Sequence, residues 1–121
     1  NILYFGCKGR NFDYIYQEEL EDALSRGVLT SLKLAFSREQ AKKVYVQNLM
    51  AEPENAAELV RLVMDQGAHI FVCGGTGMGT TVGEVFTQII AQEKGISHDE
   101  ASAILKAKHK NKMYKQELWS V

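Results

Sequence analysis

Cysteine is scarce in this sequence, and its two copies, Cys7 and Cys73, stand far apart. Two cysteines are too few for a disulfide framework, and their lone positions lack the paired spacing of a zinc site. We therefore interpret both as reduced thiols of a cytoplasmic protein. The histidines add no metal-ligand cluster, because His98 and His109 are expected on helix surfaces, far from any group of ligands.

Long apolar runs and an excess of charge of one sign are also missing. No run approaches the roughly 20 apolar residues of a membrane span, and no signal-peptide pattern opens the chain. The net charge of −1 supplies no field that would recruit nucleic acid or an anionic membrane surface. We therefore expect neither nucleic-acid binding nor direct membrane contact. With 45% hydrophobic and 24% charged residues, the 121 residues are expected to form one globular domain.

Segments with strand and helix patterns alternate along the chain. Apolar runs of strand length occur at residues 1–5, 28–36 and 69–73, and residues 114–119 are expected to form a short final strand or an extended tail. Helical spacing of apolar residues or helix-boundary signals mark residues 13–26, 44–50, 55–66, 82–94 and 97 onward. This order predicts an α/β fold with most of a doubly wound parallel sheet. Gly6, Ser37 and Gly74 are expected at neighbouring carboxyl ends of that sheet.

Helix boundaries follow from a few residues with special backbone or capping roles. Pro53, the only proline, is expected to break the chain or bend it. Asn55 is then a favourable N-cap, with Glu58 at the third helical position. Ser97 and Glu100 form a capping box for the last helix. Glycines are expected to end three helices, at Gly27, Gly67 and Gly95.

Hydrogen-bond donors are densest between Phe36 and Gln47, directly after an apolar run. The donors are a hydroxyl, a guanidinium, two ammonium groups, a phenol and an amide, on Ser37, Arg38, Lys42, Lys43, Tyr45 and Gln47. A strand that runs into a polar loop places such groups at the carboxyl end of a sheet, where open α/β folds bind ligands. Guanidinium suits phosphate, and a phenol ring adds a stacking face. The set favours a phosphorylated adenosine over a bare sugar, and the alternative is an ordinary solvated loop.

The order of these residues resembles that of a known family. Ser37-Arg-Glu-Gln, a short basic spacer and Lys43-Val-Tyr-Val-Gln47 are similar to the 2′-phosphate site of the diflavin reductases, the family of cytochrome P-450 reductase. The similarity continues through residues 4–7, 13–20, 67–74 and 117–120, and it covers nearly the whole chain. The resemblance implies that residues 1–121 are the C-terminal part of a Rossmann-like NADPH-binding domain of the ferredoxin reductase type. The first strand and main phosphate loop of that domain are expected upstream of this chain.

The resemblance implies NADP(H) as the cofactor and assigns residues to it. The 2′-phosphate and adenosine are expected on Ser37, Arg38, Lys43, Tyr45 and Gln47. Further contacts, toward the pyrophosphate and nicotinamide ribose, are expected from Cys7, Lys8, Gly74, Gly75 and Met78. Relatives often have arginine at Lys8, so a bidentate contact is lost there, and a plain surface charge is the alternative. The glycines of residues 73–79 alternatively serve only a tight turn and close helix packing.

The resemblance also implies catalytic roles near the end of the chain and at Cys73. Cys73 matches a cysteine held near the nicotinamide C4, and the alternative is a buried core cysteine. Glu117 matches an acid that is often aspartate, one methylene shorter. Trp119 matches an aromatic residue that stacks on the flavin and is displaced by nicotinamide, and a hydrophobic plug at the sheet edge is the alternative. Gly75 stands where the family usually has an acidic residue, so the contact of that carboxylate is in doubt.

Two classes of function follow. The first is the NADPH-binding portion of an oxidoreductase that passes hydride to FAD and then electrons through FMN to a haem or iron–sulfur acceptor. Its partners would be FAD-binding and FMN-binding domains of the same polypeptide and an acceptor protein or domain. Alone, the chain is expected to bind neither flavin and to be inactive. The second class is a non-catalytic nucleotide-binding or regulatory module. The Glu117–Trp119 pair favours the first, because a pure binder has no need of an aromatic gate.

Overall fold

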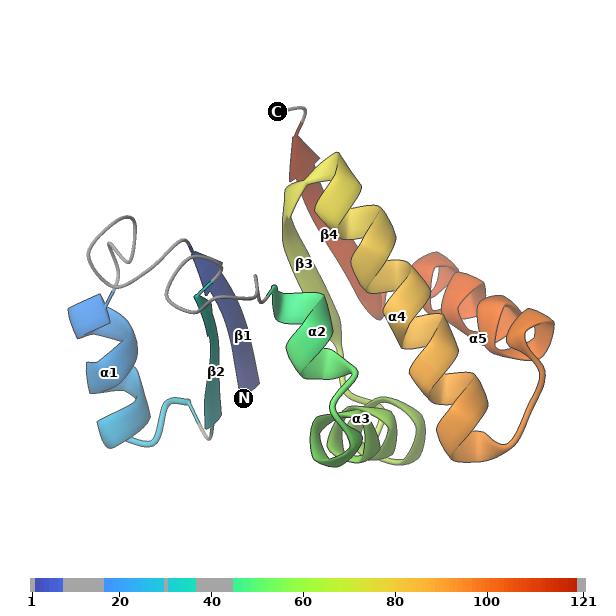
Figure 1. Ribbon diagram of the computed structural model, residues 1–121, viewed down its shortest axis with the longest axis horizontal. Coiled ribbons are helices and arrows are strands. Elements are labelled where there is room, and N and C mark those ends of the chain that lie inside the picture. Colours follow the sequence, from blue (N-terminus) through green and yellow to red (C-terminus); the bar gives the residue numbers. More distant parts are fainter. Residues whose placement is uncertain (1, 8–16, 30, 37–44, 120–121) are drawn as a thin grey trace. The chain divides into compact units, whose positions relative to one another are not determined.

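The computed structural model describes residues 2–7, 17–29, 31–36 and 45–119. They belong to two compact units, Asn1–Leu49 and Met50–Val121, and each is described by itself (Figure 1). The predicted combination of helices with parallel strands is confirmed in both units. Among the described residues the strands form two separate two-stranded sheets, so a single doubly wound sheet stays a prediction. No described helix has the length and apolar character needed to cross a membrane.

The first unit is a strand–helix–strand arrangement. Its elements are β1 (Ile2–Cys7), α1 (Gln17–Ser25) and β2 (Ser31–Phe36). The strands run parallel, which requires a crossover between them, and α1 lies within that crossover. The register ends with Cys7 beside Phe36. The carboxyl ends of β1 and β2 therefore lie side by side at one edge of this sheet.

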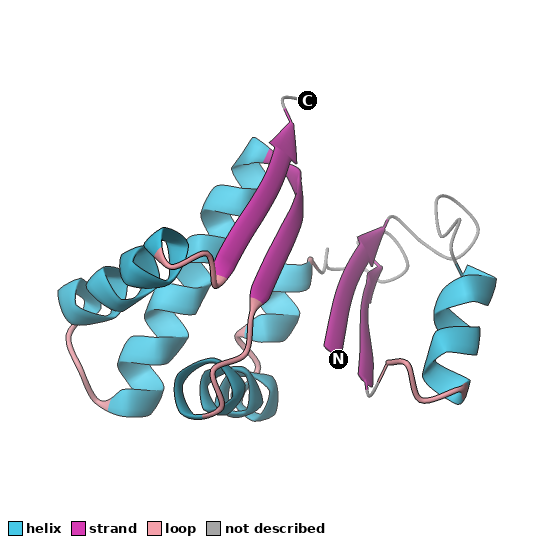
Figure 2. Cartoon of the chain, turned by 180° about the vertical axis from the view of Figure 1, so that it is seen from behind, coloured by secondary structure: helices cyan, strands magenta, loops and turns pink. Residues whose placement is uncertain are grey.

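The second unit contains most of the helices. Along the chain come α2 (Val46–Met50, which crosses the junction of the units), α3 (Pro53–Val60), the π-helical turn η1 (Arg61–Asp65), β3 (Ile70–Gly75), α4 (Thr76–Lys94), α5 (His98–Lys110) and β4 (Tyr114–Trp119). β3 and β4 are parallel neighbours. Within this unit, α4 and α5 cover one face of the strand pair, and Figure 2 shows the opposite face open.

The core of the second unit lies between the helices and the covered face of the strands. Ile90 in α4 and Ala101 in α5 have no exposed surface. Phe86 meets the ring of Tyr114 edge-on, with 5.9 Å between ring centroids and an interplanar angle of 78°. Such an arrangement lets the positive edge of one ring meet the negative face of the other. In β3, buried Ile70 and Val72 alternate with exposed residues, as the two-residue period of a strand requires.

The expected break near Pro53 is confirmed, because α2 ends at Met50 and a separate helix follows, but the expected N-cap at Asn55 is wrong. Helix α3 begins at Pro53 itself, and Glu52 is its N-cap in extended conformation. Proline is well tolerated at the first helical position, because its missing N–H would have no intrahelical partner there. Asn55 lies inside the helix and is buried, and its side-chain amide donates to the Glu52 carboxylate at 3.2 Å.

The expected glycine-rich turn over residues 74–79 is much shorter in the structure. Only Gly74 and Gly75 precede α4, which already begins at Thr76. Gly77 and Gly79 are helical, although glycine weakens a helix interior by about 1 kcal/mol. The apolar pattern predicted a helix over residues 82–94, and the observed helix begins almost two turns earlier.

Several expected helix ends are confirmed. Gly27 and Gly95 have left-handed backbones, with φ of 78° and 64°. The hydroxyl of Ser97 accepts the backbone N–H of Glu100 at 3.1 Å, so Ser97 caps α5 as predicted. These positions were predictable because each depends on one residue and its local backbone.

The π-helical turn after α3 was not predicted. The N–H of Gln66 donates to the carbonyl of Arg61, the i→i+5 pattern of a π turn, at 3.2 Å. The carbonyl of Val63 in the same turn accepts the ammonium of Lys108 from α5 at 3.1 Å. A second ammonium, on Lys94, reaches Asp65 at 2.7 Å. The wide turn is thus held by side chains from α4 and α5.

Replacing Lys108 should reveal the stabilisation from this cross-helix contact. Lys108→Met keeps much of the aliphatic stem but removes the donor, so we expect the free energy of unfolding to fall by about 1–2 kcal/mol. Lys106→Met, an exposed lysine of the same helix, is the matched control. Urea denaturation of the three proteins measures the effect, and equal losses in both variants would rule out a specific role for the Lys108 contact.

Candidate functional site

The end of the β3–β4 pair brings together residues that are far apart in the sequence. Cys73 is the register partner of Glu117, and Gly75 is the partner of Trp119. Partners in parallel strands present their side chains to the same face of the sheet. Cys73 and Glu117 are both exposed on the open face. The structure thus places two of the three predicted catalytic residues, Cys73 and Glu117, side by side. The backbone of the third, Trp119, lies two residues further along β4.

The open face of this strand pair is partly apolar. Phe71 is 68% exposed, and the ammonium of Lys115 lies 5.7 Å from the centroid of its ring. Together with Cys73 and Glu117, these residues border a shallow hollow of about 520 Å³. Parallel strands are usually covered on both faces, so an exposed phenylalanine here marks a surface suited to further contacts. Cys73 is exposed, so the alternative of a buried core cysteine does not hold, while its place near the nicotinamide C4 stays a prediction.

The turn between β3 and α4 is shaped by Gly74. Its φ of 154° lies in a region that residues with side chains rarely adopt. A side chain at Gly74 would also collide with the methyl group of Met78 in the first turn of α4. The N-cap of α4 is Gly75, which offers no side-chain hydrogen bond to the helix. The first N–H groups of this helix are therefore not capped by a side chain, an arrangement that suits an anionic ligand.

Only part of the predicted 2′-phosphate site lies within the described residues. Tyr45 is 44% exposed at the start of α2, and its N–H donates to the side-chain oxygen of Asn48 at 2.8 Å. The Oε1 atom of Gln47 is enclosed and has no hydrogen-bond partner among the described residues. The other predicted contacts of this site, Ser37, Arg38 and Lys43, lie outside the described residues, and so does Lys8, which is predicted to contact the pyrophosphate. Cys7 is the last residue of β1 and lies beside the end of β2.

The amino-acid sequence was compared with family models and with curated proteins. Residues 1–84 match the model of the oxidoreductase NAD-binding domain. The chain belongs to this family. Its relatives include the NADPH–cytochrome P-450 reductase of Salmo trutta, which is 40% identical over 120 residues, 98% of this chain and 20% of the relative. The reductase of Cavia porcellus is also 40% identical, over 98% of this chain and 17% of its own length. That of Drosophila melanogaster is 38% identical over 99% of this chain and 17% of its own length.

The comparisons confirm the resemblance inferred from the sequence. A chain that matches NADPH–cytochrome P-450 reductases over nearly its whole length, within the NAD-binding domain family, carries an NADP-binding part of an oxidoreductase. The chain spans about a fifth or less of the length of these relatives. The strand–helix elements of both units agree with this domain class, in which nucleotides bind at the carboxyl ends of parallel strands.

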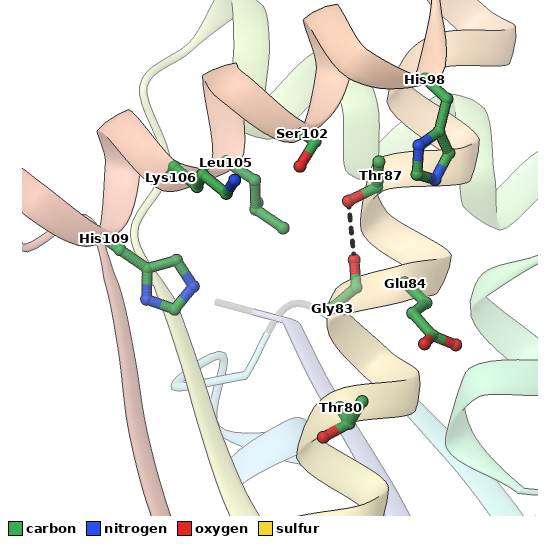
Figure 3. Close-up of a pocket in the computed structure, with 9 residues that line it drawn as sticks. All are labelled: Thr80, Gly83, Glu84, Thr87, His98, Ser102, Leu105, Lys106 and His109. Carbon is green, nitrogen blue, oxygen red and sulfur yellow. Dashed lines mark hydrogen bonds between the residues drawn. The ribbon is translucent and has the colours of Figure 1, made fainter.

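A second hollow of this NAD-binding domain lies between α4 and α5 (Figure 3). It measures about 290 Å³ and is bordered by polar groups of both helices, Thr80, Glu84, Thr87, His98, Ser102, Lys106 and His109, with Gly83 and Leu105. His98 and His109 lie on the exposed surface of α5, as expected, and both border this hollow. Within α5 the two histidines, Ser102 and Leu105 are spaced three or four residues apart. This spacing places them on one face of the helix and could have been read from the sequence. No group of three or more metal-ligating residues forms among the described residues.

Tyr114 lies beneath this hollow and is almost completely buried. The ring of His109 lies 4.2 Å from its ring, between centroids, at an interplanar angle of 30°. Its hydroxyl has no hydrogen-bond partner within the described part of the chain. Burial raises the pKa of Tyr114 to about 12, because the charged phenolate is poorly solvated there.

Tyr114→Phe should therefore change how stability depends on pH. Between pH 10 and about 12 the unfolded chain loses the Tyr114 proton while the folded chain keeps it, so stability falls as pH rises. The difference amounts to about 2–3 kcal/mol when the whole range is crossed. The phenylalanine variant should lose this decline and be at least as stable near neutral pH, since it removes a buried hydroxyl without a described partner.

Urea denaturation at about pH 8 and about pH 11 tests this expectation through the difference between variant and parent. Tyr45→Phe is the control, because that ring is exposed. A variant that loses as much stability as the parent between these two pH values would contradict the account of Tyr114.

Proposed function

We propose that this chain is the NADPH-binding portion of a flavin-dependent oxidoreductase of the cytochrome P-450 reductase type. The observation that carries the proposal is the β3–β4 register, which sets Cys73 beside Glu117 and Gly75 beside Trp119. These are the residues that the family resemblance assigns to the nicotinamide. They meet at the carboxyl end of parallel strands, in a chain about 40% identical to NADPH–cytochrome P-450 reductases.

The described residues fit a dinucleotide. The uncapped start of α4 offers N–H donors to a pyrophosphate or ribose, and Gly74 lets the backbone approach it closely. The exposed thiol of Cys73 packs against a ring without adding charge, and Glu117 accepts hydrogen bonds beside it. Tyr45 presents an exposed ring to the adenosine end. NADPH, when bound, supplies the hydride, while these residues hold and orient it.

For the whole protein we propose hydride transfer to FAD and electron transfer through FMN to a haem or iron–sulfur acceptor, in the cytoplasm. The partners of this chain are then the FAD-binding and FMN-binding domains of the same polypeptide and the acceptor protein or domain. For the domain as a whole we propose the doubly wound, Rossmann-like sheet of the ferredoxin reductase type. The names of the relatives support an NADPH-dependent reductase, and the parallel pairing in each unit supports the fold proposed for the domain.

Cofactor choice should depend on Arg38. A guanidinium binds the 2′-phosphate through charge-assisted hydrogen bonds, each contributing about 1.5–3 kcal/mol, so Arg38→Ala should weaken 2′,5′-ADP binding roughly tenfold or more. The affinity for 5′-AMP should change little, because that nucleotide lacks the 2′-phosphate. Calorimetry with both nucleotides measures the effect.

Arg26→Ala is the matched control for that measurement, because Arg26 is an exposed arginine of the same unit that pairs with Asp22 at 3.3 Å. It should leave both affinities unchanged. Equal affinities of the unmutated protein for 2′,5′-ADP and 5′-AMP would remove the assignment of NADPH as the preferred nucleotide.

Trp119 should control nucleotide choice in the full-length enzyme. If its indole covers the flavin at rest, nicotinamide must displace it before the reacting atoms come within about 3–3.5 Å. NADH has least binding energy for this displacement because it lacks the 2′-phosphate. Trp119→Ala should therefore relax the preference for NADPH, tighten binding of the oxidised nucleotide and slow its release.

Steady-state kinetics with NADPH and NADH test this role, and Trp119→Phe is the control because it keeps an aromatic face. An unchanged ratio of the two kcat/KM values in Trp119→Ala would mean that Trp119 only packs at the edge of the sheet.

A further inference from the structure

Helix α4 touches strand β4 most closely where Gly79 meets Leu118. Gly79 is buried, and a Cβ atom added to it would lie 2.5 Å from Cδ1 and 2.7 Å from Cδ2 of Leu118. Non-bonded carbon atoms do not come this close, so the leucine occupies the space that any side chain at Gly79 would need. The contrast with Gly83 in the same helix is clear, because a Cβ there would meet only the Tyr114 hydroxyl, at 3.9 Å.

Leu118 also stands between the two residues of β4 that the candidate site uses. Its register partner is Gly74, while its neighbours Glu117 and Trp119 pair with Cys73 and Gly75. Side chains alternate along a strand, so Leu118 points toward the helix-covered face while Glu117 belongs to the open face. The contact with Gly79 therefore fixes the backbone from which both neighbouring side chains extend.

We propose that Leu118 and Gly79 are positioning residues for nicotinamide: the leucine, seated directly on the backbone of α4, holds Glu117 and Trp119 in place against Cys73 and Gly75. This inference rests on the proposed function. Neither Leu118 nor Gly79 touches the nucleotide itself. Their contact ties the end of β4 to the first turns of α4, and so it holds the backbone of β4 in place. Glycine at position 79 weakens helix α4 but allows the helix backbone to lie directly against Leu118 of β4.

The consequence is a sharp steric requirement. A methyl group on Gly79 forces Leu118 out of its rotamer or shifts the end of β4. Displacements of about 1 Å at groups that orient a reaction can slow it as much as 100-fold. The 2′-phosphate end should not respond, because its predicted residues belong to a different unit of the chain.

The test uses the full-length reductase and measures flavin reduction by saturating NADPH in stopped flow. Gly79→Ala should slow this step about 10- to 100-fold, while the Kd for 2′,5′-ADP changes by less than about twofold. Adding Leu118→Val should restore most of the rate, because valine lacks the two Cδ atoms and reaches only the level of Cγ, 3.2 Å from the new Cβ. Gly83→Ala is the matched control in the same helix and should reduce flavin at the parental rate.

Two results would overturn the proposal. One is a Gly79→Ala enzyme that unfolds at a lower temperature yet reduces flavin at the parental rate, which is the signature of a purely structural contact. The other is a double variant that gains no rate over Gly79→Ala. Should Gly79→Ala not fold, Leu118→Ala replaces it, and slower flavin reduction with unchanged 2′,5′-ADP affinity supports the same role while an unchanged rate contradicts it. Failure of the proposed function itself would appear separately, as an unmutated protein that neither prefers 2′,5′-ADP nor reduces flavin.

Discussion

Parallel pairing of β3 with β4 is the interaction on which the candidate site depends. One register shift would move Glu117 away from Cys73 and turn its side chain toward the helices, since strand side chains alternate between faces. The register is held on the covered face, where Ile70, Val72 and Tyr114 are buried beneath α4 and α5. Burial on one face thus determines the chemistry presented on the other. Residues that stabilise the fold and residues of the candidate site thus alternate along the same two strands.

The sequence predicted the elements that depend on local signals. The four strands, the left-handed glycines at Gly27 and Gly95 and the capping serine Ser97 all lie where single residues or short patterns placed them. Family resemblance supplied the residues of the site, and the register of β3 with β4 then brought Cys73 and Glu117 together. The predicted residues of the 2′-phosphate loop, 37–43, fall outside the described part of the chain, so their roles remain predictions.

Two of the misses involve tertiary contacts that no short sequence pattern contains. Glycines at Gly77 and Gly79 indicated a loop, but helix α4 passes through both. The close contact with Leu118 explains the missing side chain at Gly79, and nothing in the structure explains the glycine at Gly77. The π turn after α3 likewise depends on Lys108, which approaches Val63 from a distant helix. The N-cap of α3 was misplaced for a different reason: proline stops the preceding helix but is itself well suited to the first position of a new one, so α3 begins at Pro53 and not after Asn55.

Gly74 and Gly75 show why two neighbouring glycines need separate explanations. Gly74 has a φ of 154°, where a side chain is strained whatever space surrounds it. Gly75 is extended, with φ of −68° and ψ of 153°, and any residue adopts that conformation. Backbone geometry therefore does not explain why Gly75 replaces the acidic residue usual at this place in the diflavin reductases. A carboxylate at an N-cap would accept the first N–H groups of α4, whereas glycine leaves them without a side-chain partner. With Gly75 as the N-cap, the start of α4 has no negative side chain at this position, and this suits an anionic ligand such as the pyrophosphate proposed above.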